Sequence, residues 1–381
     1  INDILPAILD NKEFIVVNKD DYRVVNYVMA GNETFPPVTD LNSAIRRECR
    51  GMIFDKNGFI ISRRLHKFFN VNEREETLID NIDMTRNHVI LEKLDGSMVT
   101  PIPLYDENGN MKLRWGTKMG ITEVSMQAEE FVAKHPQYTE LCELLIDRSK
   151  TPIFEWCSRQ NRIVVDHPQD RLVLIAVRDI NTGGYWPYSS LKTYAESYGV
   201  ECVKQYAGTV DSMEKLLDRA TSLVDEEGWV IRFDNGHMLK VKGQWYLNLH
   251  RVKDDLSSEK GVLNIIFNQT IDDLKPFMLL EDLVRIETFE RNVIVGLTKT
   301  IEGLEKYMKV VHKIYDRKTF ALERAPSLVP AIRAIIFSCW DGKNSVSDMV
   351  YSTIKKSLNK QDKINEVRFL WGGHEWKYAN N

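Results

Sequence analysis

The sequence predicts an α+β protein in which a domain of antiparallel β-sheets precedes a small all-helical domain. Its 381 residues exceed what a single hydrophobic core usually organises. Up to about residue 250, short runs of β-type residues alternate with turn residues. Beyond that point apolar residues recur at the spacing of a helix. We therefore predict a sheet domain over residues 1–253 and an all-helical domain over residues 254–381.

The predicted strands are short apolar runs bounded by turn residues. The runs cover residues 14–17, 22–29, 51–54, 59–61, 172–177 and 228–233. The turn signals lie at residues 20–21, 56–58, 107–109 and 234–236, and three of them contain Asn-Gly. Asn-Gly between two apolar runs favours a tight antiparallel hairpin. Helices are predicted at 123–135 and 191–198.

The C-terminal third has the periodicity of packed helices. Apolar residues recur at Ile301, Leu304, Met308, Val311 and Ile314, and again at Ile332, Ile335, Ile336 and Cys339. This spacing places them on one face of a helix. Ser345, with Asp348 three residues later, has the pattern of a helix N-terminus.

Composition excludes several classes of protein. Hydrophobic residues make up 43% and charged residues 28%, which is ordinary for a globular protein. The net charge of −4 means that any contact with nucleic acid must come from a local basic surface. The five cysteines are scattered and never spaced as Cys-x-x-Cys, so we expect reduced thiols, a cytoplasmic protein and no zinc site.

Targeting and phosphate-loop motifs are also missing from the sequence. No segment is long and apolar enough to span a membrane, and no signal-peptide pattern begins the chain. No Gly-rich phosphate loop of the Walker or Rossmann type occurs. If the protein binds a nucleotide, side chains must therefore hold the phosphates.

Residues 88–99 carry the first candidate for chemistry. An apolar run ends in Lys93, Asp95-Gly96 follows as a turn, and a second apolar run begins. One interpretation is a surface hairpin with Lys93 in water. The other is a nucleophilic lysine at the mouth of a pocket. An amine attacks only when neutral, so such a lysine needs cationic neighbours or removal from water.

Two basic stretches could bind an anion. Arg50 stands directly before the apolar run 51–54, where an arginine can hold a phosphate, although a solvated basic cluster is equally consistent. Lys67 precedes Phe68 and Phe69, a mixture that suits a nucleotide or nucleic acid. The alternative is that these aromatic residues belong to the core.

Three further stretches place charges against predicted strands. Glu155 lies within an aromatic run and needs a partner there, either a ribose hydroxyl, an ammonium group or the nearby Arg162. Glu227 and the acids before it suit Mg²⁺, or form a charged turn. Lys240 and Lys242 lie on one face of a strand, where they would bracket an anion or form a solvated edge.

One reaction accounts for these stretches together. Attack of the Lys93 amine on the α-phosphate of a nucleoside triphosphate would give a lysyl phosphoramidate. Arg50, Lys67, Lys240 and Lys242 would cradle the phosphates and stabilise the charge that develops on the leaving pyrophosphate.

The order and spacing of these motifs resemble the covalent nucleotidyltransferase superfamily of ATP-dependent ligases and mRNA capping enzymes. The motifs are Lys93-Leu94-Asp95-Gly96, Phe154-Glu155-Trp156, Glu227-Gly228-Trp229-Val230 and Leu239-Lys240-Val241-Lys242. Within it the chain is most similar to the type 1 RNA ligases of T-even bacteriophages, which repair tRNA. The distinguishing stretches are residues 48–51, 66–70, 161–164, 242–246 and 272–275.

The resemblance implies a role for each matching residue. Lys93 would become adenylylated, with Lys118 and Tyr246 as further essential residues. Tyr27 would contact ATP, Glu155 the nucleotide sugar, and Glu227 both metal and nucleotide. Asp272 would be associated with the metal. Arg50, Lys67, Lys240 and Lys242 match residues that contact the ATP phosphates. The chain departs from the T-even bacteriophage ligases at Leu94, where they have an acidic residue although the position varies in the superfamily, and mildly at Trp229.

The implied function is that of an ATP-dependent RNA ligase with Mg²⁺, or alternatively Mn²⁺, as metal. Lys93 takes AMP from ATP, AMP passes to a 5′-phosphate RNA end, and a 3′-hydroxyl displaces it. The resemblance further implies a tRNA substrate, an end-healing kinase and phosphatase acting upstream, a monomer, and the cytoplasm of an infected bacterium. The helical domain would choose the RNA.

Rival functions make different predictions. A DNA ligase or a GTP-dependent capping enzyme would continue into a five-stranded barrel after Lys242, which the helical periodicity argues against. A non-catalytic RNA-binding protein with this fold would have lost Lys93 or its phosphate-binding partners.

Overall fold

The computed structural model describes residues 1–31, 33–206, 210 and 212–377. The chain divides into two compact units, Ile1–Leu247 and Asn248–Asn381. Helix α7 (Gln244–Leu256) contains both this division and the boundary predicted after residue 253. No turn residue interrupts the helix between these positions, so the sequence pattern carries no mark of where one unit ends.

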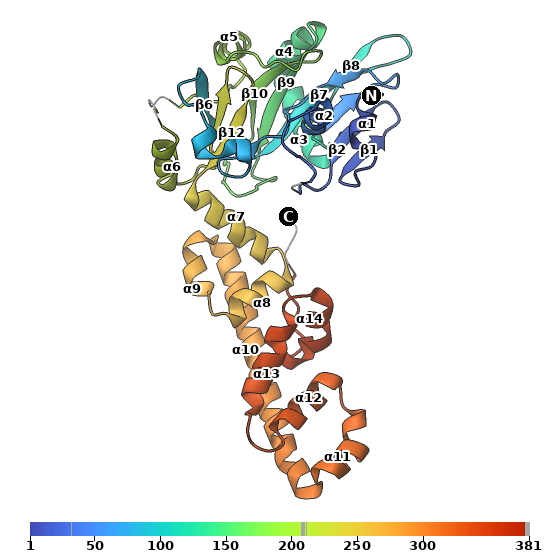
Figure 1. Ribbon diagram of the computed structural model, residues 1–381, viewed down its shortest axis with the longest axis vertical. Helices are drawn as coiled ribbons and strands as arrows, with labels where there is room; N and C mark the ends of the chain where they lie inside the picture. Colours follow the sequence, from blue (N-terminus) through green and yellow to red (C-terminus); the bar gives the residue numbers. More distant parts are fainter. Residues whose placement is uncertain (32, 207–209, 211, 378–381) are drawn as a thin grey trace. The chain divides into compact units, whose positions relative to one another are not determined.

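The first unit is built on three four-stranded sheets (Figure 1). The first has the order β1 (Phe14–Asn18), β2 (Arg23–Tyr27), β3 (Met52–Phe54), β4 (Ile60–Ser62). The second has the order β10 (Arg171–Asp179), β9 (Lys150–Cys157), β7 (Ser97–Tyr105), β8 (Met111–Gly116). The third has the order β5 (Phe69–Asn70), β12 (Met238–Lys242), β11 (Gly228–Phe233), β6 (His88–Lys93).

The predicted antiparallel hairpins are confirmed at β1–β2, β3–β4, β7–β8 and β11–β12. The short strand β5 differs, because it pairs with β12 in parallel. The surface-hairpin interpretation of residues 88–99 is wrong. β6 pairs with β11 whereas β7 pairs with β8 and β9, so Asp95-Gly96 carries the chain from one sheet to another. A side chain at Gly96 would begin 2.4 Å from the carbonyl oxygen of Trp156, which explains the glycine there.

Helices cover the second sheet. The helices of this unit are α1 (Leu5–Ile8), α2 (Leu41–Glu48), α3 (Glu123–Ala133), α4 (Pro136–Asp147), α5 (Tyr188–Tyr198) and α6 (Met213–Thr221), with 3-10 turns η1 (Glu75–Thr77) and η2 (Ile79–Asn81). Leu141 and Leu145 of α4 and Leu191 of α5 are buried in one core with Phe154 and Trp156 of β9. This packing makes β9 rigid where it carries Glu155.

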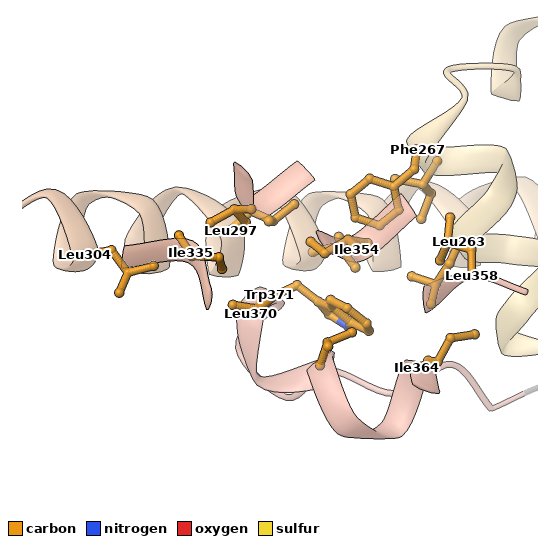
Figure 2. Close-up of a cluster of buried hydrophobic side chains, with 14 of the residues drawn as sticks. Leu263, Phe267, Leu297, Leu304, Ile335, Ile354, Leu358, Ile364, Leu370 and Trp371 are labelled. Atoms are coloured by element: carbon orange, nitrogen blue, oxygen red, sulfur yellow. The ribbon is translucent and has the colours of Figure 1, made fainter. Parts of the chain in front are cut away.

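The second unit contains only helices in the part that the structure describes. They are α8 (Glu259–Phe267), α9 (Ile271–Leu274), α10 (Leu280–Ile314), α11 (Arg317–Glu323), α12 (Pro330–Cys339), α13 (Val346–Ser357) and α14 (Gln361–Val367), with 3-10 turns η3 (Lys275–Phe277), η4 (Ala325–Ser327) and η5 (Arg368–Trp371). Figure 2 shows how Leu297 of α10, Ile354 of α13 and Trp371 lie in one buried cluster. The predicted start at Ser345 is confirmed, since its side chain accepts a hydrogen bond from the backbone N–H of Asp348 at 3.0 Å.

The described helices include none that is both long enough and apolar enough to cross a membrane.

Candidate active site

One face of the third sheet gathers the predicted lysines. Gly228 of β11 lies opposite Lys93 of β6 on one side and Lys242 of β12 on the other. Two residues further along β11, Val230 lies opposite Lys240. Because side chains alternate between the faces of a sheet, Lys93, Lys240 and Lys242 share a face. The prediction that Lys240 and Lys242 lie on the same side of a strand is confirmed.

Glu227 joins two of these lysines. Nζ of Lys93 lies 2.7 Å from one carboxylate oxygen of Glu227, and Nζ of Lys242 lies 3.1 Å from the other. The Glu227 side chain is only 4% exposed, whereas the two lysines are 20% and 25% exposed. A buried carboxylate needs such partners to remain charged. The pair of ammonium groups is thus held on the pocket side of the sheet by one shared acid.

Gly228 permits this arrangement. Its φ of +138° is one that only glycine adopts without strain. A side chain there would begin 2.0 Å from the carbonyl oxygen of Val241 on the neighbouring strand. Strand β12, which carries Lys240 and Lys242, therefore approaches β11 closely because position 228 has no side chain.

Asp95 is the anchor of the turn that follows Lys93. One oxygen of its buried carboxylate accepts hydrogen bonds from the backbone N–H groups of Val164 and Val165, both at 2.7 Å. The other accepts from the hydroxyl of Tyr246 at 2.8 Å. Burial, with the nearby charge of Glu227, raises the pKa of Tyr246, so this hydroxyl remains a donor. Tyr246 thus acts through Asp95 on the segment that presents Lys93, and its ring lies 5.0 Å from Nζ of Lys242.

A second group of cations surrounds Tyr27. The ammonium groups of Lys67 and Lys118 lie 5.4 Å and 5.0 Å from the centre of its ring. Burial first, and the charge of Arg50 second, lowers the pKa of both lysines, that of Lys67 to about 8. Arg50 is therefore close enough to both to interact through its charge.

Lys240 has the most perturbed amine of the group. Burial first, and then the positive charges of Arg50, Lys67, Lys93 and Lys242, lower its pKa to about 6. Its Nζ lies 4.8 Å from the centre of the Phe68 ring, which Arg50 also approaches at 5.7 Å. A group of amines that repel each other in this way is stabilised when an anion binds among them.

A hollow of about 120 Å³ lies beside Lys93. Its polar lining includes Arg50, Lys93, Glu155 and Lys240, and its apolar walls include Phe68 and Val230. Burial raises the pKa of Glu155 to about 7, and the charge of Lys93 opposes this rise. Both Phe68 and Phe69 are buried, but the first lines the hollow and the second lies in the core beside Phe35.

The first unit thus brings together nine predicted residues, and one prediction falls elsewhere. The nine are Tyr27, Arg50, Lys67, Lys93, Lys118, Glu155, Glu227, Lys240 and Lys242, and Tyr246 joins them through Asp95. Asp272 belongs to the second unit, where its 82% exposed carboxylate forms an ion pair with Lys275 at 2.8 Å.

The geometry does not provide a metal site made by the protein alone. Among the described residues, no three His, Cys, Asp or Glu side chains gather around a point where a metal ion could be held. Both oxygens of Glu227 already face lysines. Mg²⁺ is often bound by few carboxylates together with substrate phosphates. The donor set here fits a metal that enters with the nucleotide, and does not fit a resident ion.

Sequence reasoning missed three residues of this region. Asp95 was interpreted as a turn residue, and its Asp-Gly pattern gives no sign of the hydrogen bonds it accepts. Arg64 is buried and donates to Thr100, Gly51 and Gly116, but in the sequence it is one of several adjacent cations. Arg232 is a single charge within the apolar run 228–233. The signal that identified Glu155, a charge inside a strand, would have identified Arg232 as well.

Comparison with known proteins places this site in a family. A family model described as RNA ligase matches residues 48–246, which is more than half of the 381 residues. A protein of Thermovibrio ammonificans named "Putative RNA ligase" is 28% identical over 278 residues, covering 71% of this chain and 69% of its own length. A protein of Autographa californica nuclear polyhedrosis virus named "Putative bifunctional polynucleotide kinase/RNA ligase" is 27% identical over 299 residues, and the match covers 71% of this chain but 40% of that protein.

Among solved structures, an archaeal ATP-dependent RNA ligase is similar to the chain with a TM-score of 0.43 and 15% identity. The match covers 67% of this chain and 64% of that one.

Proposed function

Because this chain belongs to the RNA ligase family, we propose that it joins RNA ends in an ATP-dependent reaction that begins with adenylylation of Lys93. The observation that carries the proposal is the arrangement Lys93–Glu227–Lys242 beside a hollow lined by further cations. This arrangement supplies a nucleophile, a proton acceptor and a binding site for phosphates at one place.

In the first step the Lys93 amine attacks the α-phosphorus of ATP. The N–P bond forms, and the P–O bond to pyrophosphate breaks. The amine must lose a proton to attack, and Glu227 is the carboxylate within hydrogen-bond reach of it. Lys242 keeps the Glu227 carboxylate paired while Lys93 moves to the nucleotide.

The cations of the first unit hold the triphosphate in this step. Lys240, Arg50 and Lys67 repel one another before ATP binds, and the phosphates relieve this repulsion. The same charges stabilise the negative charge that accumulates on the leaving pyrophosphate. Glu155 lines the hollow beside Lys93, where it would contact a ribose hydroxyl.

A divalent ion, Mg²⁺ or Mn²⁺, enters in this proposal as part of the substrate, bound to the phosphates of ATP. Both oxygens of Glu227 face lysines, and Mg²⁺ commonly takes ligands from substrate phosphates, which supports this part of the proposal. In this proposal Glu227 and Asp272, the residues predicted to act on the metal, would contact an ion that is already bound to the nucleotide.

The later steps use RNA. AMP passes from Lys93 to a 5′-phosphate end, giving a 5′,5′-pyrophosphate, and a 3′-hydroxyl then displaces AMP and closes the strand. We further propose that the substrate is a cleaved tRNA healed upstream by a kinase and phosphatase, and that the second unit selects it. The protein would act as a monomer. The five cysteines form no disulfide, which suits the reducing cytoplasm of a host cell.

The second unit argues against a DNA ligase or capping enzyme. Those enzymes were expected to continue into a five-stranded barrel, whereas the described residues 248–377 contain helices and no strand. A non-catalytic RNA-binding protein with this fold would differ from a ligase in forming no covalent adduct with AMP. Labelling with ATP therefore decides between a ligase and a binding protein.

The experiment is incubation of the full chain with Mg²⁺ and ATP labelled at the α-phosphate. We expect one labelled protein band from ATP and none from GTP. Lys93→Ala should abolish the band, and Lys112→Ala should keep it, because Lys112 is an exposed lysine of β8. An unlabelled wild-type protein would refute the proposal and favour a binding protein.

A further inference from the structure

Arg232 is a buried cation whose charge no neighbour balances. The residue is 6% exposed, and its Nη2 atom is buried with no hydrogen-bond partner. No described acidic side chain forms an ion pair with it. Burial lowers its pKa, and the groups whose charge opposes this shift, Tyr185, Cys202 and Tyr188, include no carboxylate.

A second buried arginine of this unit, Arg178, has partners for its charge and its hydrogen bonds. Arg178 is buried to a similar extent, at 3% exposed, but its guanidinium pairs with Glu48 at 2.6 Å and donates to the carbonyl oxygen of Gly183. An unpaired buried guanidinium is costly, and a bound water, ion or ligand is a common explanation for such an unsatisfied group. Arg232 therefore points to an acceptor that comes from outside the chain.

The register of β11 places Arg232 at the far end of the nucleotide hollow from Lys93. Gly228 lies opposite Lys93, and Arg232 lies opposite Val89. These positions are four residues apart on one face of the strand, or roughly 13 Å at the usual rise of a strand. Arg232 lines the same hollow as Lys93, with Val230 between them on the strand.

The reaction orients the nucleotide along this line. The α-phosphate must meet Nζ of Lys93, so either the nucleoside or the pyrophosphate extends toward the other end, and the lining of that end decides which of the two fits. The walls of that end are apolar and include Leu91, Val230 and Met238, which suit the flat face of a base. A purine offers ring nitrogens as acceptors in its plane, and a guanidinium offers donors.

We propose that Arg232 donates a hydrogen bond to an acceptor nitrogen of the purine ring of the bound nucleotide and so determines which base this site accepts. The inference rests on the proposed function. It extends that function by assigning base recognition to a residue outside the motifs that identify the family.

Arg232 also lines a larger hollow of about 710 Å³, together with His88, Tyr185 and Asp234. An anion bound there would be an alternative partner for the guanidinium. That partner would not depend on the atoms of the base, so base analogues separate the two possibilities.

The experiment measures binding by calorimetry in the full chain with Lys93→Ala, which prevents turnover. ATP is compared with 1-deaza-, 3-deaza- and 7-deaza-ATP, in which one ring nitrogen at a time is replaced by carbon. We expect one analogue to bind roughly 10- to 100-fold more weakly than ATP, as for loss of a charge-assisted hydrogen bond. The Arg232→Met variant should bind ATP more weakly than the parent protein does, by a similar factor. It should bind that analogue no more weakly than it binds ATP.

Arg86→Met is the matched control, because Arg86 is an exposed arginine paired with Asp234 at 2.6 Å. It should keep the preference for ATP over the analogue. Equal binding of ATP and all three analogues by the parent protein would overturn the inference. This comparison does not depend on the folding of an Arg232 variant. An equal loss for all nucleotides in Arg232→Met would overturn it too. Normal discrimination with no adduct on Lys93 in the unmutated protein would instead refute the proposed function alone.

Discussion

Glu227, the residue directly before strand β11, forms a 2.7 Å ion pair with Lys93 at the end of strand β6. The pair means that the proposed nucleophile is held by its own proton acceptor before ATP arrives. Since Lys242 contacts the other oxygen of the same carboxylate, the acid stays paired after Lys93 leaves it. The geometry thus links deprotonation of the amine to its movement toward the phosphate.

Replacing Glu227 by Gln should slow adenylylation of Lys93 about 100-fold or more, the usual loss for a general base. The amide keeps the size of the side chain but no longer accepts the proton. Single-turnover labelling with excess ATP measures the rate of this step. Glu226→Gln is the control, because Glu226 is exposed and adjacent in sequence. Equal rates for both variants would show that Glu227 does not take the proton.

Binding of ATP or pyrophosphate should take up protons near pH 8. Burial lowers the pKa of Lys240 to about 6 and that of Lys67 to about 8, so these amines are partly neutral before the anion arrives. The phosphates favour the charged amines and raise both pKa values. Affinity should therefore be greatest at or below pH 6 and should fall as pH rises above 6, by at most about tenfold per pH unit for each proton taken up.

Calorimetry of pyrophosphate binding in buffers of different ionisation enthalpy counts these protons. Lys240→Arg keeps a positive charge across this range and should reduce the uptake, whereas the exposed Lys112→Arg should not change it. Identical uptake in wild type and Lys240→Arg would mean that Lys240 does not meet the phosphates.

Substituting Gly228 by Ala should destabilise the first unit by roughly 3 kcal/mol, because a Cβ would overlap the Val241 carbonyl oxygen at a φ of +138°. Urea unfolding followed by tryptophan fluorescence measures the change. Gly109→Ala separates the effect of steric overlap from the effect of a positive φ. Gly109 also has a positive φ, of +81°, but has open space around it. That variant should lose about 1 kcal/mol. Similar losses at both positions would show that close approach of the strands is unimportant.

Local sequence patterns predicted the strands and the lysines because both obey short-range rules. Alternation along β12 placed Lys240 and Lys242 on one face, and Ser345 marked a helix start. The pairing of β6 with β11 joins residues far apart in the sequence, and no local pattern specifies it. For the same reason Asp95 was interpreted as half of a hairpin turn, although its partners come from residues 164, 165 and 246. Contacts between residues so far apart in the sequence leave no local pattern from which they could be predicted.

Arg64→Met should raise the KM for ATP and lower stability together. Arg64 donates to Thr100 at 2.9 Å, to the carbonyl oxygen of Gly116 at 3.0 Å and to that of Gly51. Gly51 follows Arg50, and Gly116 lies two residues before Lys118. Loss of the guanidinium leaves buried acceptors unpaired, at about 1–3 kcal/mol each, and frees the two segments to move.

The readouts are urea unfolding and the ATP dependence of labelling. Arg148→Met is the matched control, because Arg148 is exposed and its guanidinium lies over the ring of Tyr194 and donates to its hydroxyl. We expect it to leave both properties within error of the wild type. An unchanged KM in Arg64→Met, measured where the variant is folded, would limit Arg64 to stability.

A chain ending at residue 256 should still adenylylate Lys93 but should join RNA ends poorly. The lysines, Glu155, Glu227 and the Asp95–Tyr246 hydrogen bond all lie within residues 1–247, whereas Asp272 is removed with the helices. Val252 and Leu256 belong to the core of the second unit, so both are changed to Ser in the shortened chain to keep it monodisperse. We expect labelling within about tenfold of the full chain, because the residues assigned to the amine and the phosphates in the proposed first step belong to the first unit. Lys93→Ala in the same shortened chain gives the background. A folded short chain that takes no label would contradict this prediction. If Asp272→Asn in the full chain then labels normally, the second unit contributes a residue other than Asp272 to the first step.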